Sequence, residues 1–469
     1  LFFSIILVGL VFLSRLFYLQ VYDTNNYSLL EDNAIRKVYD YPKRGFVYDR
    51  NGELLVANQP SYDVMVIPRE VKPLDTIEFC KLLKISKDQF ISKLNKAYHY
   101  SPRLPSPFVP QLSKKDYAVL QEKMRKFEGF YIQKRSLRYY QTTIGANVLG
   151  DIGEVNNGDI SKDPYYKMGD LKGKQGIEAS YEKTLRGVKG IKRILRDRFN
   201  RNIGSFKEGK YDTIPEQGKD ITITIDAKLQ AYGELLMKNK RGGIIAIEPS
   251  TGEILAMISA PTYDPNILVG RDRSKNFTTL YYDTIAKPLF DRSLKAQYPP
   301  GSPFKVLNAL IGLQENVVTT DEKFGCRMGY YLGSRKLTGC HHHKTPLSMN
   351  GGIALSCNAY FVNVYRRIIE KYDKPHDGMD VWSNHIKSFG LGNYLGYDYF
   401  YTPHIIKSIE GETIDKNYTT PKYTTIDKEH FEPVVQGMFD VFNNGTAASL
   451  RVKDIEICGK TGTAENFMK

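Results

Sequence analysis

Cysteine is scarce in this chain, and so are long apolar runs. Five cysteines among 469 residues are too few to frame a small disulfide-stapled protein. Only one long apolar run is present, at the N-terminal end of the sequence, which excludes a protein with several membrane spans. Internal repeats and low-complexity tracts are lacking as well, so a solenoid or a linker-rich chain is not expected.

The composition that remains is typical of a folded globular chain. Hydrophobic residues make up 41% and charged residues 25%, which excludes wholesale disorder and a collagen-like repeat. The length predicts about three domains. A net charge of +14 suits an anionic partner such as a membrane surface, a wall polymer or a nucleic acid, and it does not choose among them.

The apolar run covers residues 1–21 and is interrupted once, by Arg15. About 20 apolar residues cross a bilayer as a helix, so we predict a single N-terminal membrane anchor. A cleaved signal peptide is the competing interpretation, but no small-residue cleavage site follows the run. A buried core helix is a further alternative. Because the chain begins with Leu rather than Met, we also expect residues to be missing before it.

The sequence after the apolar run divides into two parts. Residues 22–215 are rich in Lys, Arg and Tyr, and short β-like runs alternate there with turn signals. Within this part, residues 74–100 have helical apolar spacing. We expect an irregular module of mixed α/β structure.

From residue 216 the pattern becomes more regular. Residues 221–226 alternate as a strand does, and Asp226 is placed to cap a helix that follows. Two further strand-like runs are joined at residues 250–252, where Ser, Thr and Gly indicate a hairpin turn. The order of strand, helix and hairpin predicts an antiparallel sheet with helices packed on it, and therefore an α+β fold.

Ser302 lies where a helix is expected to begin. Residues 299–301, Pro-Pro-Gly, break the chain, and Pro303 takes the favoured first helical position. Lys305 follows three residues after Ser302, so the two side chains share one face of the first turn. A serine hydroxyl is a weak nucleophile until a base accepts its proton, and a lysine with a lowered pKa can be that base. The helix N-terminus also offers N–H groups to an oxyanion.

Two further motifs make this pair specific. An S-x-x-K match alone is weak evidence, since residues 180–183 fit it equally well. After Ser302, however, the chain carries an S-x-N motif at residues 356–358 and a K-T-G-T segment at residues 460–463. Three motifs in this order are far more specific than any one of them.

This trio resembles the signature of the penicillin-binding proteins and serine β-lactamases. Residues 44–52 resemble the R-G-x-I-x-D-R-N-G motif of the class B, monofunctional penicillin-binding proteins. Residues 176–187 resemble the G-x-E…L-x-G segment of the same class, which accounts for the second S-x-x-K match. The resemblance covers nearly the whole chain. The sequence of residues 15–21, and an end soon after K-T-G, resemble the type that serves cell elongation.

The resemblance implies a domain order and an activity. The domains would be a transmembrane anchor over residues 1–21, a non-catalytic, dimerisation-like pedestal over residues 22–215, and a transpeptidase domain over residues 216–469. The last would have the serine β-lactamase-like fold, an antiparallel sheet flanked by helices. The implied activity is peptidoglycan D,D-transpeptidation through a serine acyl-enzyme during cell-wall elongation, with β-lactams as inhibitors.

The resemblance also implies a location and partners. The chain would cross the inner membrane once and hold its catalytic domain in the periplasm. Its partners would be peptidoglycan stem peptides, β-lactams, the membrane, a membrane glycosyltransferase and a scaffold protein of the elongation complex. Nucleic acid is not expected among them.

The resemblance assigns roles to the site residues. Ser302 would attack the carbonyl of the penultimate D-alanine of a stem peptide, and Lys305 would be its base. The backbone N–H groups of Ser302 and Thr463 would form the oxyanion hole. Ser356 would relay protons, and Asn358 would hold Lys305 and the substrate amide. Gly462 would leave the K-T-G strand bare so that substrate can lie against it. The donor's terminal carboxylate would be bound by Lys460, Thr461 and Thr463.

Other enzyme classes lack their required residues in this sequence. A class A β-lactamase needs a deacylating Glu after its S-x-N motif, but the nearest E-x-x-L motif begins at Glu182, far before Ser302. A bifunctional synthase needs paired catalytic carboxylates before the transpeptidase, and residues 22–215 show no such pair. A catalytically weak or inactive penicillin-binding scaffold of the elongation machinery remains the alternative.

Three of the five cysteines lie close together in the sequence. Cys326, Cys340 and Cys357 are accompanied by His343, and three cysteines with one histidine are a recognised structural zinc set. We therefore expect a structural zinc site, while catalysis needs no cofactor; some elongation-type relatives carry a metal site in this region. His341 is the alternative histidine. A disulfide between Cys326 and Cys340 is the competing interpretation, since the periplasm is oxidising.

The sequence departs from the family pattern near Gly396. A G-Q-G segment and a T-P-x-Q-x-A helix normally lie between S-x-N and K-T-G, and neither is present. The chain also stops at Lys469, where the fold would need a further strand and a closing helix. We expect that segments of the protein are absent from this sequence at both places.

Overall fold

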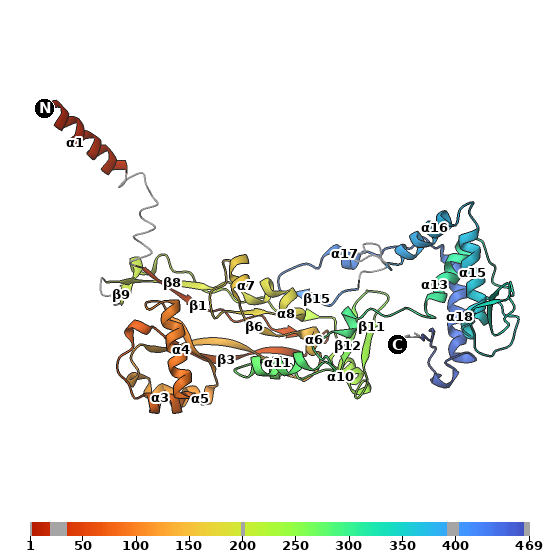
Figure 1. The fold of residues 1–469 in the computed structure, drawn as a ribbon, viewed down its shortest axis with the longest axis horizontal. Coiled ribbons are helices and arrows are strands. Elements are labelled where there is room, and N and C mark those ends of the chain that lie inside the picture. Colours follow the sequence, from red (N-terminus) through yellow and green to blue (C-terminus); the bar gives the residue numbers. More distant parts are fainter. Residues whose placement is uncertain (1, 19–34, 198–201, 392–402, 464–469) are drawn as a thin grey trace. The chain divides into compact units, whose positions relative to one another are not determined.

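The computed structural model describes residues 2–18, 35–197, 202–391 and 403–463. These residues form two compact units, both coloured along the chain in Figure 1. Unit 1 comprises residues 1–247, 253–294 and 404–414, and unit 2 comprises residues 248–252, 295–403 and 415–469. The content is mixed α/β, in agreement with the sequence.

The predicted membrane anchor is not found as a membrane-crossing helix. Helix α1 covers Phe2–Phe17, which is 16 residues, whereas a bilayer requires about 20. In the described part of the chain, no helix is long and apolar enough to cross a membrane. Residues 19–21 of the predicted span lie outside the described residues.

The largest sheet of unit 1 has six strands. Its order is β15-β10-β2-β3-β4, with β5 also paired to β3. Strands β3 and β5 run antiparallel from the pair Val56–Tyr140 to the pair Val66–Phe130, so they form the long spine of the unit. The six strands are β2 (Val47–Tyr48), β3 (Leu54–Val66), β4 (Ser106–Leu112), β5 (Phe130–Tyr140), β10 (Ile221–Ile223) and β15 (Ile406–Ile409).

Three helices gather at one end of β3, as Figure 1 shows: α3 (Thr76–Leu83), α4 (Lys87–Tyr100) and α5 (Lys114–Lys123). The helical spacing of residues 74–100 is confirmed, but Lys84 takes a left-handed conformation and divides the segment into two helices. Ser86 then caps α4 in a reciprocal capping box with Gln89. A cluster of phenylalanines fills the space beneath: Phe79, Phe90, Phe108, Phe127 and Phe130.

The rest of unit 1 consists of short elements. Strand β1 (Ile35–Asp40) pairs antiparallel with β8 (Gly190–Arg196), which pairs with β9 (Asn202–Ser205). The other pair is β6 (Ile152–Glu154) with β7 (Leu171–Gly173). The remaining helices are α6 (Ala146–Leu149), α7 (Asn157–Lys162), α8 (Gly176–Ser180), α9 (Glu182–Arg186), α11 (Arg273–Tyr282) and α12 (Arg292–Lys295).

A buried ionic network joins three of these segments. Arg44 Nη2 lies 2.7 Å from a carboxylate oxygen of Glu178 and 2.7 Å from one of Glu182. Arg138 Nε lies 2.6 Å from the other oxygen of Glu178, and both of these side chains are fully buried. Buried ion pairs therefore connect the motif at residues 44–52 with α8 and α9, and through Glu178 with β5.

The predicted strand, helix and hairpin after residue 216 are confirmed. Asp226 caps α10 (Ala227–Leu236) by accepting hydrogen bonds from two backbone N–H groups. Strands β11 (Gly242–Ile247) and β12 (Ile254–Ala260) pair antiparallel across the predicted turn. The strand predicted over residues 221–226 is shorter, and as β10 it pairs with β2 and β15.

Unit 2 is mainly helical. Helices α13 (Phe304–Gln314), α14 (Met349–Ala354), α15 (Asn358–Glu370), α16 (Pro375–Ser388) and α18 (Phe431–Asn443) enclose one apolar core (Figure 1). The hairpin of β13 (Gly329–Leu332) and β14 (Arg335–Gly339) contacts α15. Fully buried core residues are Ala309, Ile311, Met349, Ile353, Tyr360, Val364, Ile368 and Val441. The short helix α17 covers Lys416–Thr419.

The expected antiparallel sheet of residues 216–469 is found only in part. Across the described residues, strand pairing there is limited to β11 with β12, β13 with β14, and β10 with its neighbours. The predicted K-T-G strand is not formed: a strand depends on hydrogen bonds to a neighbouring strand, and among the described residues no strand is paired with residues 460–463. The expected gap near Gly396 falls among residues 392–402, outside the described residues.

Candidate active site

The start of α13 positions Ser302. Gly301 precedes it with a φ of +61°, and a Cβ at this position would lie 2.8 Å from the carbonyl oxygen of Thr463. Only glycine avoids both the left-handed strain and this contact. Pro303 has helical dihedral angles and is the N-cap of α13, one residue before the first helical position predicted for it.

Three of the predicted catalytic side chains form a hydrogen-bonded group, of which Ser356 reaches Ser302. Lys305 Nζ donates to Asn358 Oδ1 at 2.5 Å, to the Ser356 carbonyl oxygen at 2.6 Å and to Ser356 Oγ at 3.1 Å. Ser356 Oγ in turn donates to Ser302 Oγ at 3.1 Å. The described residues contain no direct hydrogen bond between Lys305 and Ser302, so the Ser356 hydroxyl links the lysine to Ser302.

Lys305 is buried among these partners. Burial lowers the pKa of Lys305 to about 8, and the nearby Cys340 and Cys357 oppose this shift. A lysine with such a pKa is neutral in a useful fraction of molecules near pH 7.5. In the neutral form, its Nζ can accept the proton that Ser302 passes on through Ser356 Oγ.

Ser356 has an unusual backbone conformation. Its φ is +52°, which costs a non-glycine residue about 1 kcal/mol. The next residue, Cys357, is the N-cap of α15, and its Sγ accepts a hydrogen bond from the Tyr360 N–H at 3.4 Å. The strained turn is therefore fixed to a helix end, which holds the Ser356 hydroxyl between Lys305 and Ser302.

The K-T-G segment lies against the same helix start. A Cβ added to Gly462 would lie 3.1 Å from Pro303 Cδ, so the missing side chain allows a close approach. Lys460 Nζ donates to the carbonyl oxygen of Thr461 at 3.1 Å and to its Oγ1 at 3.2 Å. Burial, and then the charge of Lys305, lower the pKa of Lys460 to about 8. The two lysines thus influence each other, although no hydrogen bond joins Lys460 to Ser356 among the described residues.

Two residues of the site escape prediction from the sequence. The carbonyl oxygen of Gly339, at the end of β14, accepts a hydrogen bond from Asn358 Nδ2 at 2.7 Å. Thr446 Oγ1 shares a hydrogen bond of 2.8 Å with Thr461 Oγ1. Neither residue belongs to a motif, because a backbone carbonyl and a single threonine leave no spacing signal.

Comparison with protein-family models identifies the family to which the chain belongs. Residues 39–223 match the penicillin-binding protein dimerisation domain, and residues 242–400 and 397–469 match the penicillin-binding protein transpeptidase domain. The chain belongs to the penicillin-binding protein family. The resemblance found in the three motifs is thereby confirmed over most of the sequence.

Curated relatives of this penicillin-binding protein include peptidoglycan D,D-transpeptidases. The chain is 28% identical to the peptidoglycan D,D-transpeptidase MrdA of Acinetobacter baumannii, over 98% of this chain and 77% of that protein. It is 29% identical to MrdA of Escherichia coli strain K12, over 85% of this chain and 63% of that protein. Part of each relative thus has no counterpart in this chain.

Solved structures share the fold. The penicillin-binding protein PBP2 of Helicobacter pylori, in complex with MreC, aligns with a TM-score of 0.70 and 21% identity, covering 92% of this chain and 90% of that one. A chain from a structure of a peptidoglycan synthase complex that polymerises and crosslinks aligns with a TM-score of 0.61 and 21% identity, covering all of this chain and 88% of that one. At this identity the likeness shows the fold alone.

The predicted metal ligands come together beside this site. One donor atom from each of Cys326, Cys340, His343 and Cys357 lies within 4.8 Å of the others. All five cysteines of the chain are free thiols, so the competing disulfide between Cys326 and Cys340 is not formed. Cys340 Sγ and His343 Nε2 are 3.4 Å apart.

A hydrogen bond from the ring nitrogen that faces away from the thiols, Nδ1, orients the histidine of this cluster. His343 Nδ1 lies 2.7 Å from the carbonyl oxygen of Lys344, which can only accept, so Nδ1 carries a proton and, in the neutral ring, Nε2 keeps its lone pair. This lone pair is directed at the thiols, and a hydrogen bond to the outer nitrogen is the usual support of a metal-binding histidine. His341, the alternative histidine, is exposed and does not belong to the cluster.

Proposed function

We propose that this chain is a peptidoglycan D,D-transpeptidase of cell-wall elongation that works through an acyl-enzyme on Ser302. The observation that carries the proposal is the set of hydrogen bonds that joins Ser302 Oγ through Ser356 Oγ to Lys305 Nζ, whose pKa burial lowers to about 8. In this structure Lys305 donates to Ser356 and Ser356 donates to Ser302. When Lys305 is neutral and both hydroxyls rotate, the same contacts run from Ser302 Oγ to Ser356 Oγ to Lys305 Nζ, and they remove the proton of the serine as it attacks a carbonyl carbon. The family and its MrdA relatives supply the substrate class, the D-alanyl-D-alanine end of a stem peptide.

The reaction has two halves. Ser302 Oγ attacks the carbonyl carbon of the penultimate D-alanine while its proton passes through Ser356 Oγ to Lys305 Nζ. The bond to the terminal D-alanine breaks, and a proton returns along the same path to its amine. The amine of a second stem peptide then attacks the ester carbonyl, gives up its proton through the same groups and releases Ser302. One amide bond is broken and one is formed, so no oxidant or cofactor is needed.

The segment at residues 460–463 binds the donor end of the substrate. Lys460, Thr461 and Thr463 offer an ammonium and two hydroxyls for the terminal carboxylate, which a β-lactam also carries. The backbone N–H groups of Ser302 and Thr463 are the donors for the oxyanion. The proximity of Thr463 to Gly301 supports this assignment, because it places the segment directly beside the nucleophile.

Covalent labelling tests this proposal. A fluorescent penicillin should acylate the intact chain, and peptide mapping should find the label on Ser302. Ser302→Ala should abolish the label, whereas Ser180→Ala should leave it unchanged, since Ser180 lies in the second S-x-x-K match and is exposed on α8. Label that persists in Ser302→Ala would contradict the proposal.

An exchange assay separates the enzyme from the alternative of an inactive scaffold. The wild-type chain should incorporate a labelled D-amino acid into a stem-peptide donor, and Ser302→Ala should not. Acylation without any exchange would favour a weak or inactive penicillin-binding scaffold. Contacts of the pedestal with its partners would then be the main function of the chain.

A place at the membrane and two partners belong to the same proposal. Helix α1 carries exposed large apolar side chains, which suit a lipid environment: Phe3, Ile6, Leu7, Leu10, Val11, Phe12, Leu13, Leu16 and Phe17. We place the chain at the inner membrane with its catalytic unit in the periplasm. A scaffold protein and a membrane glycosyltransferase are the proposed partners, supported by the fold shared with PBP2 bound to MreC and with a peptidoglycan synthase complex. Recovery of the chain in the soluble periplasmic fraction would contradict the membrane assignment.

A structural zinc ion also belongs to the proposal. Three thiolates and one imidazole are a tetrahedral zinc set, and ligand atoms around zinc lie about 3.8 Å apart, which the cluster accommodates. Cys326, Cys340, His343 and Cys357 would hold the ion, which would tie the end of β14 to the start of α15. Protein purified without chelator should contain about one zinc per chain, and less than about half would overturn the assignment. Cys326→Ser should lose the zinc, while Cys458→Ser, outside the cluster, should keep it.

A further inference from the structure

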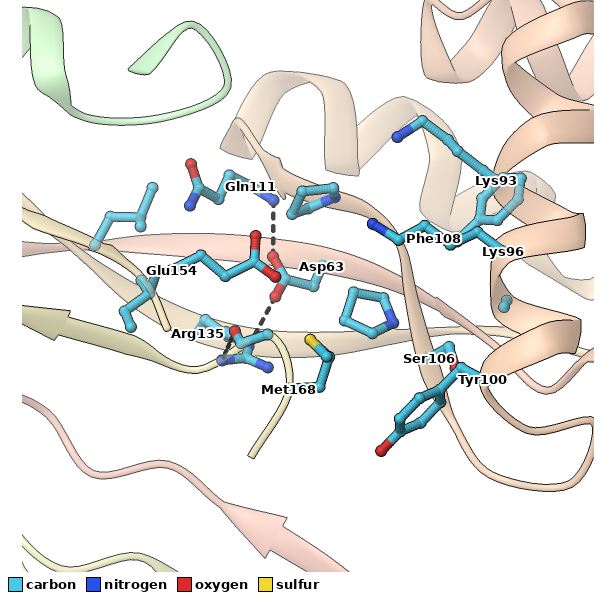
Figure 2. Close-up of a pocket in the computed structure, with 16 residues that line it drawn as sticks. Asp63, Lys93, Lys96, Tyr100, Ser106, Phe108, Gln111, Arg135, Glu154 and Met168 are labelled. Carbon is cyan, nitrogen blue, oxygen red and sulfur yellow. Dashed lines mark hydrogen bonds and ion pairs between the residues drawn. The ribbon is translucent and has the colours of Figure 1, made fainter. Parts of the chain in front are cut away.

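Unit 1 contains a cavity of about 220 Å³ that takes no part in the proposed reaction. It lies between α4, β4 and the segments around Glu154 and Gly169, and Figure 2 shows its lining. Part of its wall is apolar, including Phe108, Leu137 and Leu171. An apolar cavity with a few placed polar groups is the usual form of a small-molecule site.

One face of α4 supplies two cations to this cavity. Lys93, Lys96, Ala97 and Tyr100 line it at helical spacing, so they lie on one face of the helix. In Figure 2 the two lysine side chains extend from the helix into the cavity. Neither ammonium forms an ion pair or hydrogen bond with another described residue.

The anionic groups of the lining do not neutralise these lysines. Asp63 is already engaged, because one of its oxygens accepts from Gln111 N at 2.7 Å and the other lies 2.7 Å from Arg135 Nε. Glu154 is then the remaining carboxylate of the lining, against two ammoniums. Burial lowers the pKa of Lys93, the charges of Arg271 and Lys96 add to this effect, and the charge of Glu154 opposes it.

We propose that this cavity binds a small organic anion, whose apolar body lies against Met168 and Leu171 and whose anionic head is held by Lys93 and Lys96. The site is separate from Ser302 and goes beyond the proposed transpeptidase function, because none of its lining residues belongs to the three catalytic motifs.

Equilibrium dialysis of the intact chain with labelled 4-phenylbutyrate tests the site. This probe combines an apolar body with a carboxylate, and its neutral amide, 4-phenylbutyramide, is the matched ligand without charge. The carboxylate should bind saturably to about one site and at least about tenfold more tightly than the amide, as expected for charge-assisted hydrogen bonds. Equal binding of the two probes would overturn the proposal.

Variants locate the binding. Lys93→Gln and Lys96→Gln should each weaken 4-phenylbutyrate about fivefold to tenfold. Lys87→Gln is the matched control, since Lys87 is an exposed lysine of the same helix outside the cavity. Unchanged circular dichroism and an unchanged rate of penicillin acylation would show that the variants fold and that Ser302 is unaffected. Binding that does not respond to either cavity variant would overturn the proposal even where the transpeptidase assignment stands.

Discussion

At the scale of single residues, Ser356 combines two properties that can be separated by mutation. Its hydroxyl connects Lys305 to Ser302, and its φ of +52° strains the backbone. We predict that Ser356→Ala lowers the rate of acylation by labelled penicillin by about 10²–10⁴, because the proton path loses its middle group. Stopped-flow labelling of the intact chain measures this rate.

Ser356→Gly is the matched control for the strain. Glycine accepts a positive φ at no steric cost, so this variant removes the hydroxyl while relieving the backbone. It should lose acylation to the same extent as Ser356→Ala, yet unfold at an equal or higher denaturant concentration than that variant. Acylation at the wild-type rate in either variant would show that Lys305 reaches Ser302 without Ser356.

The structure brings together residues that the sequence singled out through motifs. Ser302, Lys305, Ser356 and Asn358 are brought within hydrogen-bond distance, and the four predicted metal ligands form one cluster. Contacts made by backbone atoms could not be predicted from the sequence. The carbonyl oxygen of Gly339 holds Asn358, but any residue has a carbonyl oxygen, so only the fold can identify it.

At the scale of elements, the loop before α13 depends on Gly301. An added Cβ would lie 2.8 Å from the carbonyl oxygen of Thr463, and the φ of +61° is itself unfavourable for other residues. We predict that Gly301→Ala pushes the K-T-G segment away from Ser302 and lowers penicillin acylation at least about tenfold. It should also destabilise the protein by about 1–2 kcal/mol in urea unfolding.

Gly333 provides the control for this prediction. It has a φ of +59°, but a Cβ there would meet nothing within 4 Å. Gly333→Ala should therefore show a similar loss of stability without the loss of acylation. If both variants acylate at the same rate, the close approach of Gly301 to Thr463 is not required for the reaction.

The helix ends of unit 2 are joined by the carboxylate of Glu315. This side chain is 11% exposed, and it accepts hydrogen bonds from Lys371 Nζ at 2.8 Å and from the Tyr372 hydroxyl at 2.6 Å, with His385 Nε2 at 2.9 Å. Burial acts to raise the pKa of Glu315, but these hydrogen bonds outweigh it and lower the pKa to about 2. The folded state therefore binds the proton of Glu315 more weakly than the unfolded chain.

Because the pKa of Glu315 is lower in the folded state than in the unfolded chain, the stability of the protein falls as the pH falls through this range. The contribution of Glu315 is fully present above the unfolded pKa of about 4.5 and is lost as the pH falls towards about 2. We predict that Glu315→Gln lowers the free energy of unfolding at pH 7 by about 1–2 kcal/mol, allowing for solvent screening, and that the difference narrows below pH 4. Urea unfolding at several pH values measures it. A difference that stays constant down to pH 3 would contradict the assignment.

Elements were predicted well where the signal is local. The hairpin β11–β12 and the cap of α10 depend on turn and capping residues close in sequence, and both are confirmed. The K-T-G strand was not found among the described residues, because a strand exists only with its neighbour. The membrane anchor was inferred from hydropathy, whereas α1 is shorter than a span requires.

At the scale of the whole molecule, the chain is two compact units with different internal supports. Unit 2 has one apolar core enclosed by helices. Unit 1 has two main apolar clusters together with the buried network of Arg44, Glu178, Glu182 and Arg138. Removing one member of a buried ionic network leaves an uncompensated charge, so its cost is larger than that of any surface pair. The stability of unit 1 should therefore be unusually sensitive to a single carboxylate.

We predict that Glu178→Gln destabilises unit 1 by about 3 kcal/mol or more, because Arg138 and Arg44 both lose a charge partner in a dry environment. Glu128→Gln is the control, since Glu128 pairs with Lys72 on the surface and its loss should cost less than about 1 kcal/mol. Circular dichroism follows the whole chain, while the single tryptophan, Trp382 in α16, reports on unit 2. In Glu178→Gln the dichroism transition should move to lower urea by more than the tryptophan transition does. Equal shifts of both signals would show instead that the two units unfold as one cooperative structure.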